Sequence, residues 1–222
     1  MRRFTLPVIL LTLLFCIPGC KADAEIKGPF NDYYIREWAA TLEPFSHEIA
    51  FYGDSRVALA DWEAAFAESD VVNLGVGGDI VEGTIQRLPL LKALDIKTCF
   101  LAIGGNNCWD RGFSEEVFRS HYDQLLCGLE DLGITVYICT IAGVTTENST
   151  LAKRHIDIAN TNMQKANVII RQLAAEHDMT LIEMADLMNN PDGTLKSEYS
   201  LDGVHFTDAG NTLWYDTLRN YI

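Results

Sequence analysis

Two short motifs near opposite ends of the chain carry residue types that could act together on an acyl group. Ser55 follows an apolar run in Gly53-Asp54-Ser55, which predicts a hydroxyl at the end of a strand where a helix begins. His205 stands three residues after Asp202 in one short loop. A histidine can take a proton from a serine while a carboxylate orients its ring. These residues indicate nucleophilic chemistry, although Gly-Asp-Ser is also a common turn and helix-capping sequence.

Two glycine-rich segments between these motifs offer hydrogen-bond donors for a developing negative charge. In Gly75-Val76-Gly77-Gly78 the glycines let the backbone approach a ligand and present its N–H groups. Asn106, which follows Gly104-Gly105, has a carboxamide that can donate without titrating. Each segment alone is compatible with a turn, and Ile80 stands where a dinucleotide-binding loop needs a glycine. Together with Ser55 they complete the set of groups that acyl transfer requires.

The elements that must position these motifs are five short apolar runs separated by helical segments. The runs cover residues 48–52, 71–74, 98–103, 134–141 and 179–184. Continuous apolar strands of this length are typical of a parallel sheet that is covered on both faces. We therefore expect an α/β fold, namely a three-layer αβα sandwich with a five-stranded parallel sheet of the flavodoxin-like type. Ligands bind beyond the carboxyl ends of the strands in such folds.

Helical periodicity is clearest in three segments. One begins near Ser114 and ends before Gly133, one spans residues 151–177, and the last starts at Thr207. A further helix is expected over residues 57–66, directly after Ser55. The apolar positions that repeat in the two long helices are Val117, Phe118, Tyr122, Leu125, Leu126, Leu129, Ile156, Ala159, Met163, Val168, Ile170 and Leu173.

The four motifs, in this order, resemble those of the SGNH hydrolases, also called the GDSL esterase/lipase family. Residues 53–55 match the nucleophile block, and residues 73–79 match the glycine block. Residues 105–107 match the asparagine block, and residues 202–205 match the terminal block. The resemblance extends over about residues 49–210, which is nearly the whole chain after its N-terminal segment. One departure is Asn107, where many members carry aspartate, and it does not touch a catalytic position.

The resemblance implies a role for each residue. Ser55 would be the nucleophile, His205 the base and Asp202 the group that holds the ring tautomer, although some members use a backbone carbonyl for this last role. The N–H groups of Ser55 and Gly78 and the side chain of Asn106 would form the oxyanion hole. Asp54 and Asn73 would be structural.

These roles predict a serine esterase that cleaves short-chain carboxylic esters, such as O-acetyl groups on carbohydrates. It would need no cofactor and no metal, and we expect Trp109 and Asn107 to contact the substrate. Three alternatives stay open: a lysophospholipase or thioesterase that acts on longer acyl chains, an acyltransferase, and a catalytically silent glycan-binding lipoprotein. An α/β-hydrolase fits less well because Val57 replaces the second glycine of its Gly-x-Ser-x-Gly motif.

The N-terminus reads as an export segment. Arg2 and Arg3 precede an uncharged apolar stretch that is too short to span a bilayer. It ends in Ile17-Pro18-Gly19-Cys20, which resembles a bacterial lipoprotein cleavage box. We expect residues 1–19 to be a signal peptide, 20–28 a tether lipidated at Cys20, and 29–222 a single hydrolase domain. An ordinary signal peptide is the alternative, and either one predicts an exported protein of the cell envelope.

The net charge limits the classes of binding partner, and the cysteines indicate which thiols remain in the folded domain. The chain carries −14, and removal of two arginines with residues 1–19 leaves −16. Such a surface disfavours nucleic acid, and membrane contact is expected only through the lipid anchor, with the oligomeric state left open. The cysteines expected in the folded domain are Cys99, Cys108, Cys127 and Cys139. Cys99 and Cys139 fall in strands, where buried free thiols are the default.

Overall fold

The computed structural model describes residues 46–109 and 111–222, so the predicted signal peptide, Cys20 and the tether lie outside the described residues. Within this part the chain forms a five-stranded parallel sheet in the order β2-β1-β3-β4-β5. The strands are β1 (Ile49–Gly53), β2 (Val71–Gly75), β3 (Thr98–Ala102), β4 (Thr135–Cys139) and β5 (Thr180–Ile182). The predicted α/β class and sheet are confirmed, and each strand overlaps its expected run.

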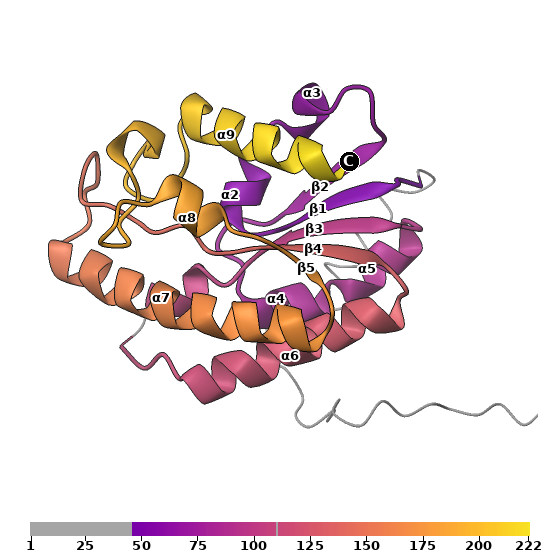
Figure 1. Ribbon diagram of the computed structural model, residues 1–222, viewed down its shortest axis with the longest axis horizontal. Coiled ribbons are helices and arrows are strands. Elements are labelled where there is room, and N and C mark those ends of the chain that lie inside the picture. The colour runs from indigo at the N-terminus through magenta and orange to yellow at the C-terminus, as the bar shows by residue number, and fades with distance from the viewer. Residues whose placement is uncertain (1–45, 110) are drawn as a thin grey trace, which may run out of the picture.

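Helices cover both faces of the sheet, which makes the three layers (Figure 1). One face packs against α4 (Val81–Gln86), α5 (Leu88–Ala93), α6 (Glu115–Asp131) and α7 (Lys153–Glu176). The other face packs against α2 (Ser55–Ala58), α3 (Trp62–Ala65), α8 (Met184–Met188) and α9 (Asp208–Leu218). Short 3₁₀ turns lie at η1 (Asn106–Trp109), η2 (Ser197–Tyr199) and η3 (Arg219–Tyr221). Among the described helices, none is both long and apolar enough to cross a membrane.

The ends of the long helices follow from local chemistry. Ser114 caps α6 by accepting from the Val117 N–H, and Thr207 caps α9 by accepting from the Gly210 N–H. Gly133 ends α6 with a φ of +69°, a conformation that glycine adopts without strain. Two positions expected in the core are instead exposed, Val117 at 50% and Val168 at 52%, because they lie at the outer edge of each apolar stripe.

The helix expected over residues 57–66 is broken in two. Asn73 on β2 donates its amide to the carbonyls of Ala58 and Ala60 at 3.2 Å each, which takes the chain out of α2. Asp61 then starts α3 by accepting from the Ala64 N–H. Trp62 thereby stacks on Phe51 of β1 with ring centroids 3.8 Å apart. Tertiary hydrogen bonds decide here against one continuous helix, and Asn73 has the structural role that was expected.

Candidate active site

The candidate site lies at the carboxyl ends of β1, β2 and β3, where the loops meet the segment before α9. Ser55 is the first residue of α2, directly after β1. Asp54 caps this helix by accepting from the Arg56 N–H at 3.0 Å, so it braces the turn. Gly53 is required here because a Cβ would stand 2.0 Å from the Ala102 carbonyl oxygen. Burial raises the pKa of Asp54, although the Arg56 guanidinium opposes the shift.

A continuous chain of hydrogen bonds joins Ser55, His205 and Asp202. The His205 Nε2 and Ser55 Oγ atoms lie 2.9 Å apart, although the residues are 150 positions apart in the chain. On the other side of the ring, Nδ1 lies 2.8 Å from Asp202 Oδ2. This arrangement can take a proton from the serine hydroxyl while the carboxylate fixes the ring tautomer.

Asp202 is held by its own loop. Its Oδ1 accepts the backbone N–H groups of Val204 at 3.0 Å and His205 at 2.8 Å. Desolvation alone would raise the pKa of Asp202, but the hydrogen bonds from His205 and the two N–H groups outweigh it and lower the pKa to about 2. The carboxylate therefore stays ionised over the pH range in which histidines titrate.

The loop after β2 brings Gly78 and Asn106 close together. Gly78 has a φ of +75°, and a Cβ there would meet nothing within 4 Å, so the backbone is open on this side. The Asn106 side chain donates to the carbonyl of Asp79, the next residue after Gly78, at 2.8 Å. A carboxamide has a second N–H that this bond does not use. The loop and Asn106 thus carry amide groups that can act as donors. Ser55 begins a helix, so its own N–H has no intrahelical acceptor.

A buried ion pair supports this loop. The Asp79 carboxylate pairs with Arg87, and both side chains are 0% exposed. Arg87 also donates to the carbonyls of Leu74 at 2.9 Å and Gly53 at 3.2 Å, at the ends of β2 and β1. Burial raises the pKa of Asp79, while Arg87 and hydrogen bonds from Ile80 and Thr84 oppose the shift. The sequence analysis did not identify Arg87 as a supporting residue. The signal that could have found it is its position as a charged residue within an apolar helical stretch.

The two predicted substrate contacts have neighbours within the fold. The Asn107 side chain accepts the Val81 N–H at 3.1 Å and donates to Glu82 Oε2 at 2.9 Å, so it fastens η1 to the start of α4. Trp109 is half-buried and packs against the core under α6 and α7. Their contact with substrate stays a prediction.

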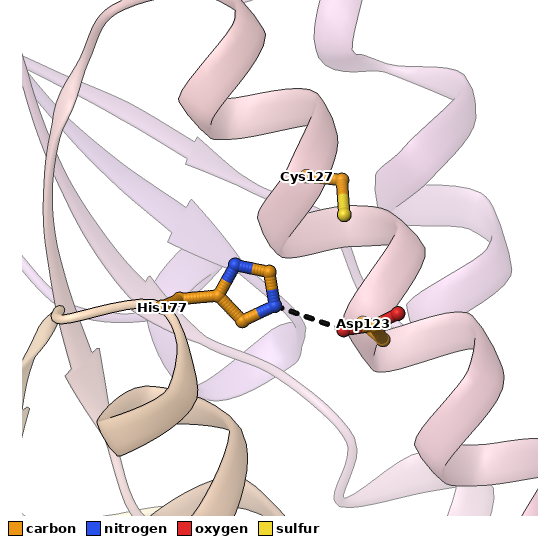
Figure 2. A group of neighbouring side chains, drawn as sticks. All are labelled: Asp123, Cys127 and His177. Atoms are coloured by element: carbon orange, nitrogen blue, oxygen red, sulfur yellow. Dashed lines mark hydrogen bonds and ion pairs between the residues drawn. The ribbon is translucent and has the colours of Figure 1, made fainter. Parts of the chain in front are cut away.

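The four cysteines of the described residues are of two kinds. Cys99, Cys108 and Cys139 are buried free thiols, as expected for Cys99 and Cys139, and burial raises the pKa of each of them. Cys127 is not one of the free thiols. It lies beside Asp123 and His177, and all three come from α6 and the end of α7 (Figure 2).

This trio has the residue types of a metal site but is already engaged. Cys127 is not one of the free thiols of the described residues. His177 lies between two carboxylates, with Nε2 2.8 Å from Asp123 and Nδ1 2.9 Å from Glu130. Burial lowers the pKa of His177, but these two hydrogen bonds outweigh it and the net shift is upward. The trio therefore fastens α6 to α7.

The described chain thus combines a five-stranded parallel sheet with a hydrogen-bonded Ser–His–Asp arrangement at its carboxyl edge. The chain belongs to the GDSL-like lipase/acylhydrolase family, whose sequence model matches residues 49–213 and so includes all four motifs. This confirms the family that the motifs indicated, and a family of acylhydrolases implies a hydrolase that acts on ester bonds.

Individual relatives agree with the fold. A GDSL-like lipase from Bacteroides thetaiotaomicron superposes with a TM-score of 0.72 at 15% identity, covering 84% of this chain and 95% of that one. An acetyl xylan esterase from Geobacillus stearothermophilus superposes with a TM-score of 0.60 at 19% identity, covering 79% and 94%. An N-acylneuraminate cytidylyltransferase from Streptococcus agalactiae is 25% identical over 202 residues, which are 90% of this chain and 45% of that protein. The chain thus spans about half the length of this curated relative.

Proposed function

We propose that the protein is a serine esterase that cleaves short-chain carboxylic esters, including O-acetyl groups on carbohydrates. The observation that carries the proposal is the unbroken hydrogen-bond chain from Asp202 through His205 to Ser55. In the proposed mechanism, neutral His205 takes the Ser55 proton as the hydroxyl attacks the ester carbonyl. The oxyanion then accepts from the N–H groups of Ser55 and Gly78 and from Asn106. His205 returns the proton to the leaving alcohol, and water repeats the attack on the acyl-enzyme.

One comparison supports small acyl groups. An acetyl xylan esterase among the structural neighbours acts on acetylated carbohydrate, by its name, and shares the fold.

The test is hydrolysis of p-nitrophenyl esters of increasing chain length, followed by acetylated glycans. Ser55→Ala should lower the rate by about four to six decades, because the nucleophile is lost. A fluorophosphonate probe should label the wild-type protein and leave Ser55→Ala unlabelled. Full retention of hydrolysis in Ser55→Ala would remove the serine mechanism, and a preference for long chains would replace the substrate class with the lysophospholipase alternative.

We also propose that the chain is exported to the bacterial cell envelope and anchored by a lipid on Cys20. The support is the order of a basic start, an apolar stretch and Cys20 in the sequence. Palmitate labelling of cells that express the protein should mark the wild type and not Cys20→Ser. Equal labelling of both proteins would show that the anchor lies elsewhere or does not exist.

A further inference from the structure

Arg56, the residue directly after Ser55, sends its side chain to the two chain neighbours of His205. Its Nε donates to the Val204 carbonyl at 2.9 Å. Its guanidinium carbon lies 4.7 Å from the centre of the Phe206 ring, within the range of a cation–π contact. Val204 and Phe206 flank His205, so one side chain contacts both chain neighbours of the proposed base, Val204 through its backbone and Phe206 through its ring.

The other end of the guanidinium is bound to the segment after β4. Nη1 donates to the Ala142 carbonyl at 2.6 Å, and Nη2 donates to the Gly143 carbonyl at 2.7 Å. Arg56 thus connects three parts of the chain: the start of α2, the segment after β4 and the loop that carries His205. These three hydrogen bonds all go to neutral backbone oxygens.

The segment after β4 is itself fixed by α7. Asn167 bonds both backbone groups of Ile141, accepting from its N–H at 2.7 Å and donating to its carbonyl at 2.9 Å. Asn160 bonds both backbone groups of Val144 in the same way, at 2.8 and 2.9 Å. These two asparagines hold the stretch on either side of Ala142 and Gly143. The carbonyls that accept from Arg56 therefore belong to a segment that α7 holds on both sides by four hydrogen bonds.

The chemistry of this site requires arginine. A planar guanidinium offers five N–H donors in a fixed fan, and here the fan reaches three carbonyls and a ring face together. A lysine ammonium has a similar charge but donates from a single point, so it cannot reproduce these directions. The charge of Arg56 also interacts with the carboxylates of Asp54 and Asp202, and lysine keeps that charge while it loses the directions of the three hydrogen bonds.

We propose that Arg56 is the positioning residue of the reaction: it transmits the fixed position of the segment after β4 to His205 and so sets the distance from His205 Nε2 to Ser55 Oγ. The inference rests on the proposed esterase function. A displacement of a base by about 1 Å costs on the order of 100-fold in rate, and substrate binding is affected much less.

The test compares Arg56→Lys with a matched control, Arg171→Lys. Arg171 also forms two hydrogen bonds of 2.8 Å, both to Glu183. Arg171 and Glu183 both lie outside the proposed site. With p-nitrophenyl acetate we expect Arg56→Lys to lower kcat about 100-fold with KM within about threefold, and fluorophosphonate labelling of Ser55 to slow in parallel. Arg171→Lys should keep the wild-type kcat. Added millimolar methylguanidinium should raise the kcat of Arg56→Ala at least about tenfold over its value without the additive.

The outcomes separate the inference from the proposed function. A kcat of Arg56→Lys within threefold of wild type, with active wild-type protein, would overturn the role of Arg56 and leave the esterase standing. Wild-type protein that cleaves no ester would overturn both. If the Arg56 variants do not fold, Phe206→Leu tests the same loop with the arginine in place. A decrease in its kcat of about three- to tenfold supports the inference, and an unchanged kcat contradicts it.

Discussion

Two arginines hold the two halves of the candidate site, and they do so in different surroundings. Arg87 is fully buried, is paired with Asp79 and supports the loop of Gly78 and Asn106. Arg56 is half-buried, binds neutral carbonyls and supports the loop of His205. Removing one partner of a buried ion pair leaves an uncompensated charge and destabilises the whole domain. Removing a donor from neutral carbonyls costs less stability, and its main effect is that the segments it joined are no longer held in one orientation. The half with Gly78 and Asn106, the proposed oxyanion hole, therefore depends on the core, and the half with His205 depends on local geometry.

The sharpest test of this difference is Arg87→Met. The substitution leaves the Asp79 carboxylate buried without its cation and should lower the free energy of unfolding by about 3–5 kcal/mol. Urea denaturation at neutral pH measures it. In the double variant Arg87→Met with Asp79→Leu, where no charge is left buried, a clearly smaller loss is expected. Equal losses in the single and double variants would show that the ion pair is not the reason for the instability.

Asn106→Ala tests the oxyanion half at the level of chemistry. It should lower kcat by about two to three decades with KM little changed, because the amide is needed only as negative charge develops. Steady-state kinetics with p-nitrophenyl acetate, beside a thermal melt, distinguishes this from unfolding. A loss of stability in proportion to the loss of activity would contradict the proposed role of Asn106 as an oxyanion donor, since Asn106 would then act only through its bond to the Asp79 carbonyl.

Asp202→Asn tests the histidine half through pH. Because the folded pKa of Asp202 is lowered to about 2, its carboxylate contributes stability above its unfolded pKa of 3.8, and this contribution is lost as pH falls through 2. The melting temperature of the wild type should exceed that of Asp202→Asn at pH 6, and the two should converge near pH 2. Loss of wild-type hydrolysis between pH 7 and pH 5 would then not reflect protonation of Asp202. A difference in melting temperature that persists at pH 2 would contradict this assignment.

His177→Gln should have the smallest effect and serves as the control outside both halves. The folded pKa of His177 is raised, so its bonds to Asp123 and Glu130 stabilise the protein below about pH 6.5 and lose this effect as pH rises through the folded pKa. The melting-temperature advantage of the wild type should shrink between pH 6 and pH 9. Hydrolysis should stay at the wild-type level, and a reduced kcat would show that the junction of α6 and α7 reaches the site.

The sequence predicted the parts of the molecule that depend on local pattern. Apolar runs marked all five strands, and Ser114 and Thr207 marked the starts of two helices, because these signals lie within a few residues of one another. The helix after Ser55 was predicted as one piece because the bonds from Asn73 that break it come from another strand.

The residues that support the site were missed for the same reason. Arg56 bonds to Val204, which lies 148 positions away, and Arg87 bonds to Gly53, which lies 34 positions away. No spacing rule connects such residues. The buried Asn160 and Asn167 interrupt the apolar face of α7 and were the one visible hint that this helix bonds to backbone outside itself.

Asn160 and Asn167 have a consequence for how this chain tolerates change in length. Loops that follow strands in α/β proteins usually accept inserted residues at little cost. Here the side-chain amides of α7 bond both backbone groups of Ile141 and of Val144, as the backbone of a neighbouring strand would. The segment after β4 is therefore held in a fixed register with α7. One added residue between Ile141 and Val144 would put at least one of the two pairs out of register. Tags and grafted segments therefore belong elsewhere on this domain, however exposed the neighbouring residues 146–148 are.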